Sequence, residues 1–204
     1  MNVDKQRKIY IVLSHNYTFF GNIVCLRQLL HFGFNDTGSK YSHVSLSLDS
    51  ELHRMLSFAR KKIHNPLIAG LVMEDISSGV FSLKPEKNYI AVICLKVTED
   101  QYNKLFLRMK EYWNKKDNYK YDIVSLFRIL FHGRDNRRCE NKNAFCCSIW
   151  VEDILRECGI DLFKNLYTVT PVDFYHKLQP YIIYEGLTKE YSNHARAGNA
   201  SHIL

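Results

Sequence analysis

The sequence predicts an α+β fold in which helices pack against a mixed or antiparallel sheet. Apolar and polar residues alternate over residues 41–49, a pattern typical of a strand with one polar face. Apolar residues recur at helical spacing over 98–113 and again over 147–158. Strand-like segments lead and most helix-like segments follow, an order that favours the α+β class.

The composition suits one folded domain. The chain has 204 residues, of which 46% are hydrophobic and 13% aromatic, enough to fill a core. We expect a single domain over residues 1–185 and a polar C-terminal tail over residues 186–204. The sequence has no apolar run of about 18 residues, so we expect no transmembrane span. Residues 1–16 lack the apolar centre of a secretory signal, so we expect a cytoplasmic protein.

The charge and the cysteine content limit the kinds of partner, metal and cofactor that we expect. The net charge of +7 is spread in small clusters, which favours weak attraction to anionic molecules over specific nucleic-acid binding. The six cysteines lack the paired spacing of a zinc site, so we expect free thiols, no metal and no cofactor. The oligomeric state is not indicated by the sequence.

The strands can be assigned in chain order. We expect them at residues 8–14, 41–49, 54–60, 69–75, 79–83, 88–97 and 181–185. Between the first two lies a helix at 21–31, with an apolar face formed by Ile23, Leu26, Leu29 and Leu30.

The later helices carry recognisable start signals. Thr98 and Gln101 have the spacing of a capping box, and Thr170 followed by Pro171 is typical of a helix start. A further helix is expected at 121–131, followed by a polar loop at 132–143.

The cysteine pair in "NAFCCSIWVEDILRECGI" (143–160) begins an amphipathic helix. Counted from Cys147, helical spacing meets apolar residues throughout: Trp150, Val151, Ile154, Leu155 and Cys158. Counted from Cys146, the same spacing soon meets Asp153 and Glu157. We therefore expect Cys147 to point inward from the first turn, and Gly159 to end the helix. A thiol there lies near unpaired backbone N–H groups, which favour the thiolate; a thiol that merely packs in the core is the alternative.

Three segments resemble a known group of enzymes. "YSHVSLSLDSELHRMLSFARK", "LIAGLVMEDI" and "AFCCSIWVEDIL" are similar to the circularly permuted branch of the NlpC-type papain-like cysteine hydrolases, which is related to lecithin retinol acyltransferase. The resemblance implies a permuted papain-like fold with Cys147 as the nucleophile. It also implies that His43, on the polar face of its strand, acts as general base and then as general acid.

Two residues compete for the third catalytic position, which orients the imidazole of His43. Ser57 is our first choice because it lies on the strand that follows His43. A neutral hydroxyl, however, stabilises an imidazolium less than a carboxylate does. Glu74 is the other candidate.

The oxyanion hole is expected to use the backbone N–H of Cys147, with Tyr41 or Ser14 as a side-chain donor. Arg60 and Lys61 are candidates for holding an anionic part of a substrate, although a solvated charge cluster explains them equally simply.

The expected function is that of a cysteine-dependent hydrolase or acyltransferase that forms an acyl-enzyme from an amide or ester. The substrate is expected to be a small molecule, a peptide or a lipid acyl group, with a peptide-like or peptidoglycan-like amide favoured. The alternative is a binding or regulatory module that keeps the fold with weak or no catalysis, as a neutral third residue suggests.

Overall fold

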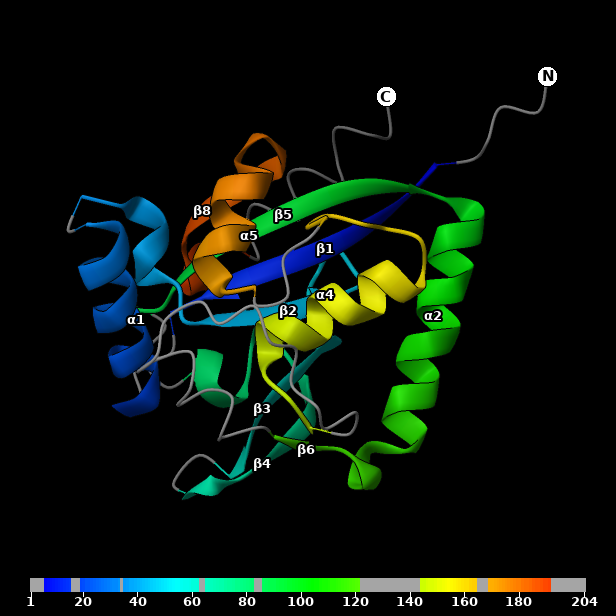
Figure 1. The fold of residues 1–204 in the computed structure, drawn as a ribbon, viewed down its shortest axis with the longest axis horizontal. Coiled ribbons are helices and arrows are strands. Elements are labelled where there is room, and N and C mark those ends of the chain that lie inside the picture. Colours follow the sequence, from blue (N-terminus) through cyan, green and yellow to red (C-terminus); the bar gives the residue numbers. More distant parts are fainter. Residues whose placement is uncertain are drawn as a thin grey trace.

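A six-stranded antiparallel sheet forms the centre of the protein (Figure 1). The computed structural model describes residues 6–15, 19–33, 35–62, 65–82, 86–121, 144–164 and 169–191. The strand order is β4-β3-β2-β1-β5-β8. The bounds are Gln6–Ser14 (β1), His43–Ser47 (β2), Met55–Lys62 (β3), Asn65–Glu74 (β4), Tyr89–Thr98 (β5) and Ile182–Leu187 (β8). A short parallel pair joins β6 (Lys120–Tyr121) to β7 (Ala144–Phe145).

Helices α2 (Glu99–Asn114), α4 (Cys147–Glu157) and α5 (Pro171–Leu178) lie against one face of the sheet (Figure 1). Helix α1 (Phe19–Phe32) lies to one side and packs against the 3-10 turn η1 (Thr37–Lys40), which leads into β2. Two further 3-10 turns, η3 (Lys116–Asn118) and η4 (Gln179–Tyr181), follow α2 and α5. The sheet and its helices give the expected α+β class.

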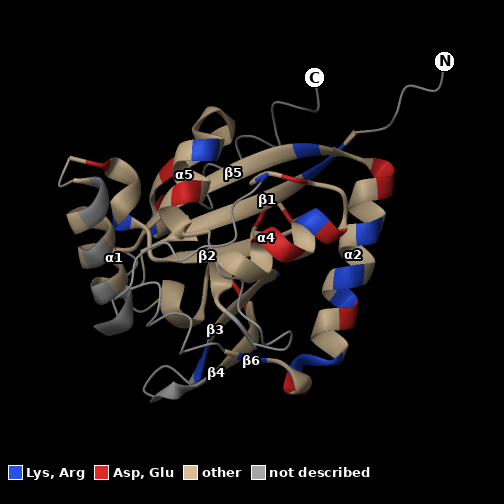
Figure 2. Cartoon of the chain, in the orientation of Figure 1, with Lys and Arg blue, Asp and Glu red and all other residues tan. Residues whose placement is uncertain are grey.

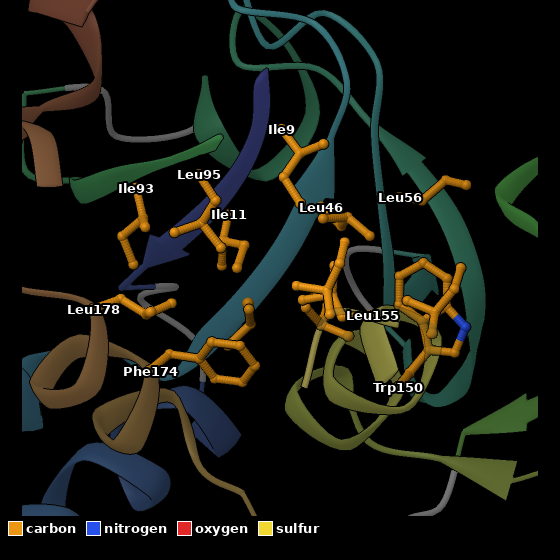
Figure 3. Close-up of a cluster of buried hydrophobic side chains, with 14 of the residues drawn as sticks. Ile9, Ile11, Leu46, Leu56, Ile93, Leu95, Trp150, Leu155, Phe174 and Leu178 are labelled. Carbon is orange, nitrogen blue, oxygen red and sulfur yellow. The ribbon is translucent and has the colours of Figure 1, made fainter. Parts of the chain in front are cut away.

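The main core lies between the sheet and these helices. Figure 3 shows its side chains: Ile11, Leu46, Leu56 and Ile93 from the strands, and Trp150, Leu155, Phe174 and Leu178 from the helices. Trp150 is fully buried and its ring lies 5.7 Å from that of Phe58 on β3. Burial of these large side chains fixes α4 against β2 and β3.

The helix ends follow the signals in the sequence. Thr98 Oγ1 accepts from the N–H of Gln101 at 3.2 Å, and Gln101 Oε1 accepts from the N–H of Thr98 at 3.0 Å, which completes the capping box. The Asp173 carboxylate accepts from both the N–H and the hydroxyl of Thr170 at the start of α5.

Some segments differ from the sequence-based expectation. Residues 79–81 form the 3-10 turn η2 (Gly79–Phe81) and not a strand, because Gly79 has φ +59°, which a strand does not allow, and Phe81 turns back to bond Ser78. The fold continues past residue 185, since β8 ends at Leu187 and Tyr191 is 1% exposed. The helix expected at 121–131 and the loop expected at 132–143 lie, beyond Tyr121, outside the described residues.

Candidate active site

Helix α4 fixes the position of the cysteine pair. Cys146 is the N-cap residue and Cys147 is the first residue of the helix, as expected. The side chain of Cys146 makes no capping hydrogen bond to the first N–H groups of the helix. At the other end, Gly159 has φ +78° and the N–H of Ile160 bonds to Leu155 O at 2.9 Å, a Schellman ending.

His43 is the first residue of β2, at the point where the sheet divides. Its cross-strand partner on β1 is Ser14. On the other side, β2 and β3 pair through Leu46 with Leu56 and Ser47 with Met55, and no pairing joins residues 43–45 to the described residues of β3. Because α4 packs against both strands, the start of the helix lies at this divergence.

The two residues expected to react lie beside each other. The side chain of Cys147 is close enough to the ring of His43 to help raise the pKa of that ring. The two are 7% and 5% exposed, so the pair is held away from bulk water. They are separated by about a hundred residues in the chain. The predicted pairing needs the start of α4 to lie beside the start of β2, and the structure has this arrangement.

Glu74, not Ser57, is the residue that contacts the other side of the imidazole. Its Oε2 accepts a hydrogen bond from His43 Nε2 at 3.1 Å and another from Ser45 Oγ at 2.6 Å. The carboxylate is 9% exposed. Because His43 Nε2 is already hydrogen-bonded to Glu74 Oε2, Nδ1 is the ring nitrogen that is available to Cys147.

Glu74 comes from β4, two strands away from His43. In the register of the sheet, Ser57 on β3 pairs with Val72 and Glu74 pairs with Met55, so the Glu74 side chain must reach across β3. The small Ser57 leaves space for this reach. Its Oγ is buried and finds no hydrogen-bond partner of good geometry among the described residues, although it helps to lower the pKa of Glu74.

The electrostatics of the site favour a charged imidazole. Burial alone lowers the pKa of His43, but the charge of Glu74 and the nearby side chain of Cys147 outweigh it and raise the pKa well above its ordinary value. Burial likewise acts to raise the pKa of Glu74, and the nearby His43 with the hydroxyl of Ser45 reverses the effect, so that pKa lies below its ordinary value. The two groups therefore form a buried ion pair around neutral pH.

Tyr41 does not face the cysteine. Its hydroxyl donates to Glu185 Oε1 at 2.8 Å, and its ring packs against Tyr175 at 5.5 Å. Tyr41 could act as the expected oxyanion donor only by giving up its bond to Glu185. Ser14 is buried beside His43 on β1, and Lys61 is exposed and lies 3.5 Å from Asp117.

A second thiol and imidazole lie close together elsewhere in the described part of the chain. His15 Nδ1 lies 3.2 Å from Cys25 Sγ, and both groups lie within 3.0 Å of Lys40 O. Burial raises the pKa of Cys25 to about 11, and burial lowers the pKa of His15. This pair is therefore held neutral, and it is a natural internal control for the His43 site.

Comparisons with known proteins give no relative: no family model, no curated protein and no solved structure matches the chain. In the part of the chain that the structure describes, no helix is long and apolar enough to cross a membrane. The same residues include no group of three or more metal-ligating side chains. All five described cysteines are free thiols.

Proposed function

We propose that this protein is a cysteine-dependent hydrolase or acyltransferase of the permuted papain-like type, acting on an amide or ester through an acyl-enzyme. One observation carries the proposal: a buried imidazole that is hydrogen-bonded to the Glu74 carboxylate and lies near enough to the Cys147 thiol for the thiol to affect its pKa. A nucleophile, a base and a group that orients the base are the parts that such chemistry needs.

Each residue has a defined role in the proposed reaction. Cys147 Sγ, as thiolate, attacks the substrate carbonyl carbon, and the His43 imidazolium gives its proton to the leaving amine or alkoxide. A thioester on Cys147 results. The neutral His43 then takes a proton from water, or from an acceptor hydroxyl or amine, which attacks the thioester. Cys147 leaves as thiolate and the imidazolium is restored.

Glu74 and the start of α4 supply the electrostatic support. The Glu74 carboxylate holds the ring and stabilises its positive charge, which it does better than the hydroxyl of Ser57. The N–H groups at the start of α4, that of Cys147 among them, are the donors for the oxyanion.

The case for a module without catalysis rested on a neutral third residue, and a carboxylate in that position favours catalysis. A peptide-like amide remains the favoured substrate over a lipid acyl group.

Competitive labelling tests this proposal. We expect iodoacetamide near neutral pH to alkylate Cys147 faster than the other five cysteines, with the sites quantified by peptide mass spectrometry. His43→Ala should slow the labelling of Cys147, whereas the matched variant His15→Ala, which disrupts the second thiol and imidazole pair, should not. Equal labelling of all the thiols in the folded protein, or no effect of His43→Ala, would reject the activated nucleophile.

A further inference from the structure

Helix α1 is oriented with polar groups inward and leucines outward. Gln28 is 5% exposed and Cys25 is 7% exposed, whereas Leu26 and Leu30 are 54% and 61% exposed. The apolar pattern in the sequence predicted the opposite for Leu26 and Leu30. A helix on a protein surface normally buries its leucines and exposes its amides.

Hydrogen bonds on the inner side fix this orientation. Gln28 Nε2 donates to Ser39 O at 3.1 Å and to Tyr41 O at 2.7 Å, and Cys25 Sγ donates to Lys40 O at 3.0 Å. Turning α1 to bury these leucines would break all three bonds and remove the Gln28 donor from the carbonyls of the buried residues Ser39 and Tyr41. The exposure of the leucines therefore follows from how α1 is attached.

We propose that the outer face of α1, formed by Leu26 and Leu30, docks onto an anionic lipid surface. The charge fits such a surface: the chain carries a net charge of +7, and residues 19–33 include no Asp or Glu. Attraction at long range comes from the net charge, and at contact the leucines enter the lipid from a helix that has no acidic residue of its own.

The size of the face argues against a second copy of the chain as the occupant. The 14 residues of α1 give a helix about 21 Å long and about 10 Å wide, a face on the order of 200 Å². A stable protein interface needs about 800 Å² from each partner.

Helix α1 is also shorter than the roughly 20 residues that cross a bilayer, so we expect it to lie in the plane of the lipid surface.

A second pair of exposed apolar residues gives a matched control. On α2, Phe106 and Leu107 are 51% and 63% exposed. They lie among charged neighbours that include the Lys104 and Asp100 ion pair at 2.7 Å, and Figure 2 shows α2 carrying both signs of charge along its length. That surface would bring acidic groups into contact with anionic lipid, so we expect it not to bind.

The test is co-sedimentation of the full chain with vesicles. Vesicles of phosphatidylcholine containing phosphatidylglycerol should bind the protein, and vesicles of phosphatidylcholine alone should bind it more weakly. The double variant Leu26→Gln and Leu30→Gln should weaken binding by about tenfold or more. The double variant Phe106→Gln and Leu107→Gln should bind as the unchanged protein does.

Three results would overturn the proposal. The first is no binding by the unchanged protein, and the second is equal binding of both double variants to anionic vesicles. The third is a dimer in size-exclusion chromatography without lipid that the α1 variant converts to monomer, because a second copy would then cover this face. Matching circular dichroism and melting curves for the two variants establish that both are folded.

Discussion

Replacing Glu74 with Gln tests the arrangement of the candidate site most directly. The variant keeps the size of the side chain and an oxygen for Ser45, and it removes the negative charge that lies 3.1 Å from His43 Nε2. A hydrogen bond to a charged group contributes about 1.5–3 kcal/mol, and one pKa unit corresponds to about 1.4 kcal/mol. We therefore expect the His43 titration midpoint to fall by about 1–2 units.

The measurement is an NMR titration of the histidine rings, with the His43 signal assigned by its loss in His43→Gln. Glu74→Asp should lower the midpoint less, because shortening the side chain by about 1.5 Å weakens the hydrogen bond but keeps the negative charge near the ring. Asp75→Asn is the control: it removes a carboxylate that lies 3.1 Å from the exposed His53, and it should leave His43 unchanged. An unchanged His43 midpoint in Glu74→Gln would refute the reasoning.

The same variant should change how stability depends on pH. The lowered pKa of Glu74 gives stability that is present above the ordinary carboxyl range and is lost as pH falls through the folded-state pKa. The raised pKa of His43 gives stability that is present below the ordinary imidazole range and is lost as pH rises through the folded-state pKa. The difference in unfolding free energy between the two proteins, measured by urea denaturation, should be greatest around neutral pH and shrink in both directions.

Two further substitutions separate the sequence-based candidates from the observed contacts. Ser57→Ala should leave the His43 midpoint almost unchanged. It should keep or slightly raise the unfolding free energy, because a buried hydroxyl without a good partner is removed. A midpoint shift as large as that in Glu74→Gln would indicate instead that Ser57 orients the ring. Tyr41→Phe should lower the unfolding free energy by about 1 kcal/mol through loss of the hydrogen bond to Glu185. The rate at which a p-nitrophenyl ester acylates Cys147 should not change. A fall of about a hundredfold in that acylation rate would instead identify Tyr41 as an oxyanion donor.

The sequence predicted the features of the site that depend on helical spacing, strand alternation and helix-ending glycines. Helical spacing chose Cys147 over Cys146 as the first helical residue, and the alternation in β2 assigned His43 to the face that carries Ser45. A glycine at position 159 ended helix α4 where expected. Each of these features depends on residues within a few positions along the chain.

The contacts that the sequence did not predict depend on how the strands and helices are arranged in space. Ser57 was chosen because its strand follows that of His43, but whether a side chain reaches across a neighbouring strand depends on its length and on the space above that strand. The available signal was an acidic residue at the end of the apolar strand that includes Glu74. Leu26 and Leu30 were misassigned because the spacing of apolar residues cannot reveal that α1 is attached through Gln28.

The divergence of β2 and β3 has a consequence for motion in the protein. β1 and β5 are paired at nine consecutive positions, from Gln6 with Thr98 to Ser14 with Ile90, whereas β2 and β3 share two. Local opening costs least where the fewest backbone hydrogen bonds must break. Local opening is therefore easiest between β2 and β3, beside the buried thiol of Cys147, and the rest of the sheet can stay paired while it happens.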